Sequence, residues 1–358
     1  MRGGLSFRPY REGDEEGIYN LHQAALPPER QKNEWMRWWY WLYKENPAGE
    51  GLIWLAEVDN RIVGQHSLIP LKIKMGNREV LSSWGVDAMT HPDYRRRGIF
   101  ETISQNLFSD AVKNGITIST GFPNEYSRPG LIKKLGWFDV SHISVKCKPL
   151  NWNKTIRILI NSNFLSVPLS VGTKLILDKF SCRTDKMSLP GDVVITRIYA
   201  FDERFDRLWS RVSEQFNIMV IRNSDYLNWR YRVPGKQYLI YTAEKNDEVS
   251  GYIVLRIKAK RNMKASVVFD MIAESEDIMY HLVLKAIESS RLAGADCIVY
   301  SLIANRAYHS ILKRAGFISI PFNHAGHFCL RQISKEIPVT LLRDPGNWFV
   351  QVGDSDEL

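Results

Sequence analysis

The chain has 358 residues, of which 44% are hydrophobic and 24% charged, as in soluble globular proteins with substantial cores. This length favours two or more domains. The net charge of +9 suits acidic ligands, but no block of five or more like charges is present, so we expect no nucleic-acid partner. No uninterrupted apolar run is long enough to span a bilayer, and we expect no stable membrane insertion.

The cysteines and histidines do not indicate a metal centre. His324 and His327 are the one close pair of histidines, and a pair alone is weak evidence for zinc, so we expect no metal. The N-terminus lacks the apolar core of a signal peptide, and the cysteines lack metal-ligand spacing, which together predict reduced thiols in a cytoplasmic protein. The cysteines are Cys147, Cys182, Cys297 and Cys329.

The first part of the chain predicts a strand at residues 5–9, a helix at 15–25, an aromatic helix and two hairpin strands. The aromatic helix is rich in tryptophan, and large aromatic side chains usually supply core area. A buried helix is therefore our interpretation, with an aromatic pocket for an acceptor as the alternative. The tryptophans are Trp35, Trp38, Trp39 and Trp41.

Residues 84–100 combine a strand, a basic turn and the start of a helix. An extended run at 84–89 leads through a proline-containing turn into Arg95, and an amphipathic helix follows at 100–112. Free backbone N–H groups and the helix dipole favour anions at such a helix start, and arginine adds donors. The stretch predicts a binding site for a ligand with joined phosphates.

Residues 95–100 read Arg-Arg-Arg-Gly-Ile-Phe. This stretch resembles the acetyl-CoA loop of the GNAT acetyltransferases, Arg/Gln-x-x-Gly-x-Gly/Ala. Phe100 departs from the pattern, because it replaces a small residue. The strand, turn and helix occur in the order that the mechanism of the motif needs. The order of predicted elements resembles the GNAT fold over residues 5–145.

The resemblance implies acetyl-CoA as co-substrate. It places the pantetheine arm along the strand end and the pyrophosphate on the loop, where Gly98 permits close approach of the backbone. It also implies that the asparagine after the next strand contacts the ligand. The cofactor-binding residues that it implies are Ala88, Met89, Thr90, Arg95, Arg96, Arg97, Gly98, Ile99, Phe100 and Asn124.

Acyl transfer to an amine also requires a base, and an acid can protonate the leaving thiolate. The family often has a tyrosine seven residues after the asparagine, but Leu131 stands there, and Tyr126 is the nearest substitute. The alternative for Tyr126 is ordinary packing. The base candidates are Asp87, Glu125 and His66, among which Asp87 could have a raised pKa on a buried strand. We therefore expect Asp87 and Tyr126 to be the catalytic residues.

The second half of the chain repeats the first. Trp41-Leu-Tyr43 is followed by Pro47, and Trp229-Arg-Tyr231 by Pro234; Gly64 and Gly251 each lie 17 residues after those prolines. Helical spacing at 100–112 and 278–292 is followed in each copy by a glycine and a strand. We interpret this as a structural duplication; two unrelated units with common turn chemistry are the alternative.

The second copy lacks the basic loop. Its matching turn, residues 272–277, is acidic, and acid there should repel a pyrophosphate. We therefore expect one CoA site, in the first copy. The fold class predicted is α/β (α+β), with two tandem GNAT-like domains that each have a mixed, largely antiparallel sheet flanked by helices. The predicted boundaries are 1–150 for the first domain, 151–190 for a connector, 191–335 for the degenerate second domain and 336–358 for a tail.

The function that the resemblance implies is N-acetyl transfer from acetyl-CoA to a primary amine of a small molecule, with an amino sugar as one candidate. Residues 226–231 and 353–356 are similar to tandem GNAT-like proteins of cell-surface polysaccharide synthesis. Two alternatives stay open: a Fem-like transferase that uses aminoacyl-tRNA, and a non-catalytic protein that binds CoA or a polymer. The sequence does not specify the acceptor or the oligomeric state.

Overall fold

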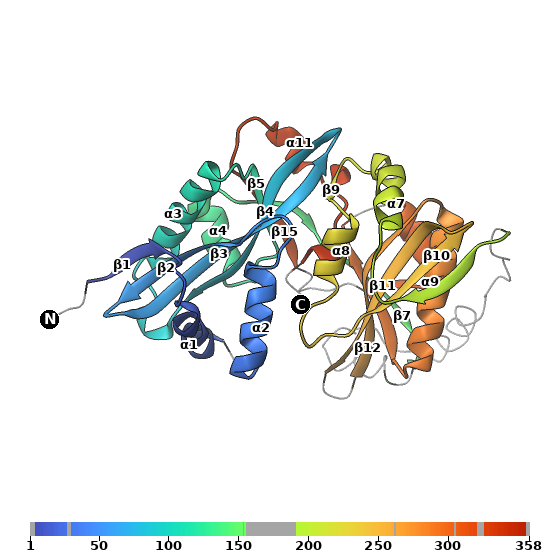
Figure 1. Cartoon of the computed structure of the whole chain (residues 1–358), viewed down its shortest axis with the longest axis horizontal. Helices are drawn as coiled ribbons and strands as arrows, with labels where there is room; N and C mark the ends of the chain where they lie inside the picture. The colour runs from blue at the N-terminus through green and yellow to red at the C-terminus, as the bar shows by residue number, and fades with distance from the viewer. Residues whose placement is uncertain are drawn as a thin grey trace, which may run out of the picture.

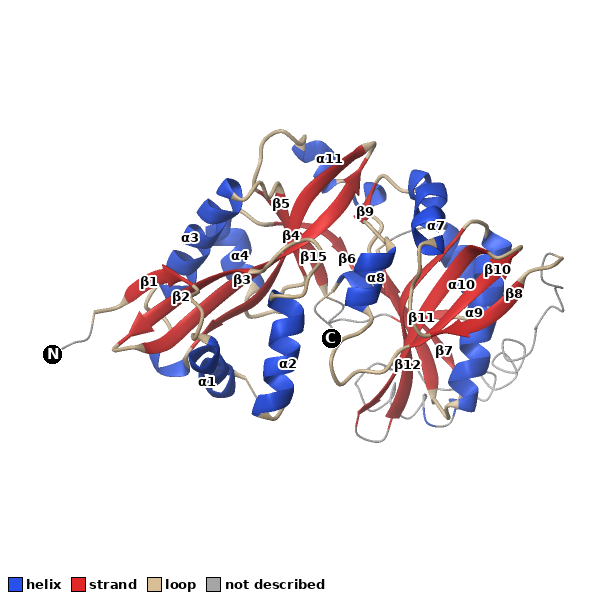
Figure 2. Ribbon diagram, viewed as in Figure 1, coloured by secondary structure: helices blue, strands red, loops and turns tan. Residues whose placement is uncertain are grey.

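The computed structural model describes residues 4–26, 30–152, 154, 191–260, 263–303, 306–320 and 326–355. Within these ranges the chain forms two mixed, mostly antiparallel sheets that lie side by side, each flanked by helices (Figures 1 and 2). The predicted fold class is thus confirmed. The predicted connector falls almost wholly on residues outside the described ranges.

The first sheet follows the hairpin and long-strand pattern that the sequence predicted. Its described strands run in the order β1 (Ser6–Pro9), β2 (Leu52–Val58), β3 (Arg61–Met75), β4 (Arg78–Thr90), β5 (Ile118–Gly121), β15 (His327–Gln332) and β6 (Phe138–His142), and β9 (Ile218–Val220) pairs with β3 beside this path.

Helices cover both faces of the first sheet (Figure 2). On one face lie α1 (Glu15–Ala25) and α2 (Lys32–Tyr43); on the other lie α3 (Ile99–Lys113) and α4 (Arg128–Leu135). The tryptophans of α2 are all less than 10% exposed, so that helix supplies core, as interpreted from its composition.

The second sheet repeats this arrangement. Its described strands run in the order β14 (Ile318–Ile320), β7 (Ser144–Pro149), β13 (Cys297–Leu302), β12 (Met263–Ala273), β11 (Glu248–Lys260), β10 (Leu239–Lys245) and β8 (Val194–Ile198). The helices of this half are α7 (Arg204–Val212), α8 (Ser224–Arg230), α9 (Glu276–Leu292) and α10 (Arg306–Arg314).

Each sheet contains strands from the other half, and β9 of the second half also pairs with β3 of the first sheet. β15 lies between β5 and β6 of the first sheet, and β7 lies between β13 and β14 of the second. The sheets therefore do not follow the predicted boundaries at residues 150 and 335. The physical reason is that the backbone hydrogen bonds of a short strand can be satisfied equally well in either sheet, so local pattern does not assign it.

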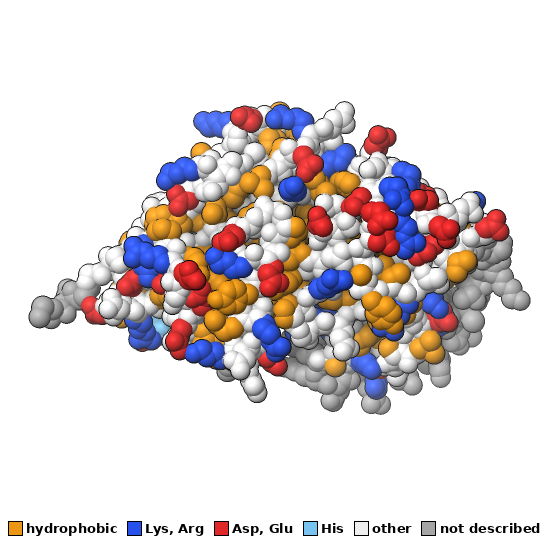
Figure 3. Space-filling view, viewed as in Figure 1, with side chains coloured by type: hydrophobic (Ala, Val, Ile, Leu, Met, Phe, Trp, Pro, Cys, Tyr) orange, Lys and Arg blue, Asp and Glu red, His pale blue; other side chains and the backbone are white. Residues whose placement is uncertain are grey.

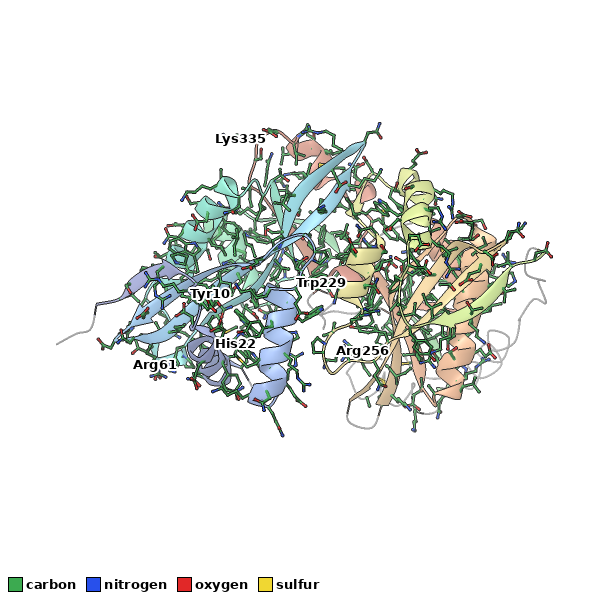
Figure 4. The ribbon with its side chains drawn as sticks, viewed as in Figure 1. Tyr10, His22, Arg61, Trp229, Arg256 and Lys335 are labelled. Carbon is green, nitrogen blue, oxygen red and sulfur yellow. The ribbon has the colours of Figure 1, made fainter. Side chains whose placement is uncertain are left out.

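Two tryptophans mark the junction between the halves and reflect the duplication. The rings of Trp41 and Trp229 stack with centroids 5.0 Å apart. The indole Nε1–H of Trp41 donates to the carbonyl of Trp229 at 2.8 Å, and that of Trp229 donates to the carbonyl of Trp41 at 2.9 Å. Figure 4 shows Trp229 at this junction. Such reciprocal contacts are typical of a local two-fold relation.

The segment predicted as a tail packs against both sheets, with its start on the first and its end on the second. It forms α11 (Val339–Arg343) and two 3₁₀ turns, η3 (Pro345–Asn347) and η4 (Val352–Asp354). In Figure 1 this red segment passes between the two halves. Its acidic and carbonyl groups bind the buried guanidiniums of Arg222 and Arg230, which need such partners away from water.

Surface charge on the second half is largely paired. Arginines of α7 form ion pairs with acids of the β10–β11 hairpin and with Glu274, and Figure 3 shows blue and red side chains mixed in this region. Exposed pairs of this kind contribute little to stability, about 0–1 kcal/mol each. Among the described residues, no helix is long and apolar enough to cross a membrane.

A substitution at Gly353 tests how closely the C-terminal segment packs. A Cβ at this position would lie 2.3 Å from Tyr231 Oη and 3.0 Å from the carbonyl oxygen of Phe269. We expect Gly353→Ala to lower the free energy of unfolding by about 1–3 kcal/mol, because overpacking forces the backbone to move. Gly346→Ala is the control, since its Cβ would meet the movable Asp344 side chain. Equal unfolding midpoints in denaturant for the two variants would contradict this packing.

Candidate functional site

β4 and β5 of the first half pair over a short stretch and then diverge. These parallel strands pair through Ser83 and Trp84 on β4 and Ser119 and Thr120 on β5. β4 continues to Thr90 without a partner in β5, so its later backbone groups form an edge that β5 does not pair. This is the edge that the sequence assigned to a pantetheine arm, through Ala88, Met89 and Thr90. An extended ligand can hydrogen-bond to such an edge as an added strand would.

Two glycines and one tryptophan lie where β4 and β5 diverge. A Cβ on Gly85 would lie 3.4 Å from the indole of Trp137, and a Cβ on Gly121 would lie 3.3 Å from the same ring. Side chains at these two positions would crowd the place where the strands diverge. The glycines therefore let both backbones lie close to the indole plane.

The loop after β4 leaves several backbone N–H groups without a backbone acceptor among the described residues. A 3₁₀ turn, η1 (Pro92–Tyr94), leads to Arg96 at φ +63° and Gly98 at φ +76°. Gly98 is the N-cap of α3 and provides no capping side chain, and the first described intrahelical donor is Thr102 N–H. The N–H groups of residues 96–101 have no backbone acceptor in the described part of the chain. Uncapped donors at a helix start favour a phosphate.

The three arginines of the loop differ in how they are held. Arg95 donates to the carbonyl of Thr90, and Arg97 donates to the carbonyl of Asp93 and stacks on Tyr94. Arg96 is exposed, and its guanidinium contacts no acceptor among the described residues. Of the three, Arg96 is thus the most available to an incoming anion.

Phe100 and Asn124 lie at the starts of α3 and α4. The Phe100 ring packs 5.7 Å from the His66 ring, centroid to centroid, and a Cβ on Gly130 would touch it at 3.3 Å. Because Gly130 of α4 has no side chain, it leaves room for the Phe100 ring at a position where the GNAT pattern has a small residue. Asn124 Oδ1 accepts from the N–H groups of Tyr126 and Ser127 and so holds the turn that precedes α4. Tyr126 itself is 85% exposed.

Asp87 lies at a β-bulge in β4. Val86 pairs with Ser67 and Met89 with Gln65, so one extra β4 residue is inserted, and Asp87 adopts φ +51°. A non-glycine residue in this region is strained by about 1 kcal/mol or more, and such residues cluster at functional sites. The bulge turns the carboxylate toward the face covered by α1 and α2.

Two side chains that the sequence did not single out as site residues meet Asp87. The Tyr43 hydroxyl donates to Asp87 Oδ2 at 2.5 Å, and His22 Nε2 lies 3.7 Å from the same oxygen. Burial raises the pKa of Tyr43 well above its ordinary value and lowers the pKa of His22, so both are neutral near pH 7. Figure 4 shows His22 on the α1 side of the sheet.

The other base candidates lie in different surroundings. His66 is 2% exposed beneath α3, where its Nδ1 lies 2.8 Å from Ser104 Oγ. Burial, with a smaller effect of the nearby Arg331 charge, lowers the pKa of His66 to about 3, so it stays neutral. Glu125 is exposed in the turn before α4. Among the described residues, neither His66 nor Glu125 forms a hydrogen bond or an ion pair with Asp87.

The matching positions of the second half repeat the tyrosine–aspartate pair. Gly64 pairs with Thr90 and Gly251 with Ala273, which makes Asp270 the equivalent of Asp87. Tyr231, the equivalent of Tyr43, donates to Asp270 Oδ2 at 2.9 Å. The repeated Trp-x-Tyr motif was the sequence signal that could have identified Tyr43.

The start of α9 differs from the start of α3. Ser275 is its N-cap and accepts from the N–H of Ile278, and Glu276 and Asp277 occupy the first turn. The helix dipole is thus matched by the helix's own acids, and one donor is already used. In the described residues no group of three or more His, Cys, Asp or Glu side chains is arranged to hold a metal.

Comparison with known proteins agrees with this geometry. Residues 6–138 match a family model described as an acetyltransferase (GNAT) domain. A search of curated protein sequences gave no match. Among solved structures, a GCN5-related N-acetyltransferase from Anabaena variabilis is similar, with a TM-score of 0.64 at 13% identity over 92% of this chain and 73% of that one.

Two further structures are similar at the same level. A GCN5-related N-acetyltransferase from Kribbella flavida gives a TM-score of 0.62 at 14% identity, covering 92% of this chain and 71% of its own. The N-myristoyltransferase of Saccharomyces cerevisiae, solved with bound myristoyl-CoA, gives 0.60 at 11% identity, covering 92% and 83%. Residues 6–138 therefore match the model of a GNAT acetyltransferase domain, and the chain as a whole shares the fold of these structures.

Proposed function

We propose that the protein is an acyl-CoA-dependent N-acyltransferase that moves an acetyl group from acetyl-CoA to a primary amine of a small molecule. The reaction takes place in the first half. The observation that carries this proposal is the alignment of three features along β4: a strained carboxylate at Asp87, an edge without a partner in β5, and an uncapped helix start at Gly98. These features meet the three needs of thioester aminolysis: a base, a track for the ligand and an anion site.

In this proposal the β4 edge and the loop position the donor. The N–H groups of residues 96–101 bind the pyrophosphate, with Arg96 as an added cation. Backbone groups of residues 88–90 hold the pantetheine arm, which directs the thioester toward Asp87. Orientation of this kind removes much of the entropic barrier to the bimolecular step.

Asp87 then acts as the general base. The amine nitrogen attacks the thioester carbonyl carbon, its proton goes to the Asp87 carboxylate, and the C–S bond breaks to release CoA thiolate. The Ala88 N–H is the proposed donor to the oxygen that becomes negative. Tyr43 orients the carboxylate through its hydroxyl. Tyr126 remains our candidate acid for the thiolate, supported by its exposure at the start of α4.

In this proposal the amine acceptor binds at the face covered by α1 and α2. Asp87 and His22 lie on that face, beside the aromatic side chains Trp35 and Trp38. A small amine is consistent with this surrounding, since a carboxylate and aromatic faces both attract an ammonium group before it is deprotonated. An amino sugar, a role in polysaccharide synthesis and a cytoplasmic location stay predictions.

Substituting Asp87 tests the assignment of the base. We expect Asp87→Asn to lower kcat by about 100-fold or more, because general base catalysis typically contributes 10²–10⁴-fold. The affinity for acetyl-CoA should change little, since Asp87 lies on the opposite face from the loop. Steady-state kinetics with a panel of amines and calorimetric binding measure the two effects. Glu125→Gln is the matched control; a larger loss of kcat in that variant would assign the base to Glu125 instead.

Substituting Arg96 tests the loop. Arg96→Gly removes the guanidinium and keeps the positive φ free of strain, so the loop conformation is retained. We expect the Kd for acetyl-CoA to rise about tenfold, as for the loss of one charge-assisted hydrogen bond. Arg96→Lys keeps the charge and should give an intermediate Kd. An unchanged Kd in Arg96→Gly, measured by calorimetry at low salt, would exclude Arg96 from the site.

A further inference from the structure

The side chain of Gln351 is held in the second half by groups that match the site in the first. Its Oε1 accepts from the Met271 N–H at 2.9 Å and from the Tyr300 hydroxyl. Its Nε2–H donates to Asp270 Oδ1 at 2.6 Å. Gln351 is 2% exposed, and Asp270 and Tyr300 are fully buried. The carboxamide thus has a partner for both its acceptor and its donor.

These partners occupy positions related by the duplication. Asp270 corresponds to Asp87, and Met271, the next residue, corresponds to Ala88. Tyr231 holds Asp270 as Tyr43 holds Asp87. The CH₂–C(=O)–NH₂ group of Gln351 therefore lies beside Asp270 and Met271. In the first half the matching position is beside Asp87 and Ala88, where the proposed reaction would form an amide.

We infer that the second half contains an amide-recognition site and that its occupant is the chain's own Gln351. The site presents donors, Met271 N–H and Tyr300 O–H, on one side and the Asp270 carboxylate on the other. A ligand with an acceptor and a donor on the same carbon satisfies both sides, and a primary carboxamide is a neutral group with that pattern. A carboxylate in its place would be repelled by Asp270.

The surrounding contacts fix the occupant in position. Gln351 N–H donates to Asp354 Oδ2 at 2.9 Å, and Arg222 binds Asp354 and also approaches Asp270 Oδ2 at 3.3 Å. Arg222 thereby links the segment that carries Gln351 to the carboxylate that Gln351 binds. The inference concerns the second half alone and does not depend on catalysis in the first.

Chemical rescue tests the inference. Gln351→Ala removes the four heavy atoms beyond Cβ, which together have the composition of acetamide. We expect this variant to unfold at a lower temperature, because Asp270 Oδ1 and the Met271 N–H lose the Gln351 carboxamide as partner. Acetamide at ~0.5 M, roughly tenfold above a Kd of ~50 mM, should raise its Tm by about 2 °C. Wild-type protein should show no such rise.

Two matched variants make the result specific. Val352→Ala makes a cavity next to Gln351 without removing an amide, and Gln351→Met fills the space without its hydrogen bonds. Acetamide should stabilise neither. A rise in Tm that is equal in all three variants, or absent in Gln351→Ala, would overturn the inference. If Gln351→Ala does not fold in buffer, recovery of folded protein after refolding is compared with and without acetamide, and no gain would overturn it.

Discussion

The pairing of β5 with β15 is the contact on which the candidate site depends. β5 pairs with β4 through two residues and with β15 through four, from Cys329 opposite Gly121 to Gln332 opposite Ile118. Because β15 holds β5 along its whole length, β4 can diverge from it and leave an edge for a ligand. β15 also carries Arg331, which lies over Phe108 and donates to the carbonyl of Leu135. Residues from beyond position 320 therefore hold β5 in the first half, and the two halves form one structural unit.

The two halves share a skeleton but differ in what surrounds it. Each has a long strand, a bulge, an aspartate held by a tyrosine and a helix that follows. In the first half the helix start at Gly98 is uncapped and basic; in the second it is capped by Ser275 and acidic. The second aspartate is buried and bound by Gln351 and Arg222, and burial raises its pKa, whereas Asp87 retains exposed surface. The shared elements fit the duplication interpreted from the sequence, and the differences lie around the aspartate and at the helix start.

The sequence predicted the parts of the fold that are encoded locally. The helix at 15–25, the duplication and the loop from Arg95 to Gly98 all follow from short-range patterns, and the structure has the expected elements there. The exchange of β7 and β15 was not predictable, because each strand would satisfy its hydrogen bonds in either sheet. The contact between Tyr43 and Asp87 joins residues 44 positions apart and depends on a bulge that no periodicity reveals. The segment around Gln351 forms only the short 3₁₀ turn η4, which has no periodicity to read, so its burial could be seen only after the fold was known.

The central claim is that the first half binds acyl-CoA and the second does not. Isothermal titration of the full chain with acetyl-CoA measures this directly. The account predicts one site per chain, with weaker binding when the loop at Arg95–Gly98 is changed and unchanged stoichiometry when the turn at Glu274–Asp277 is changed. Two equivalent sites per chain, or a single site that survives replacement of the loop and is lost on changing the turn, would contradict it.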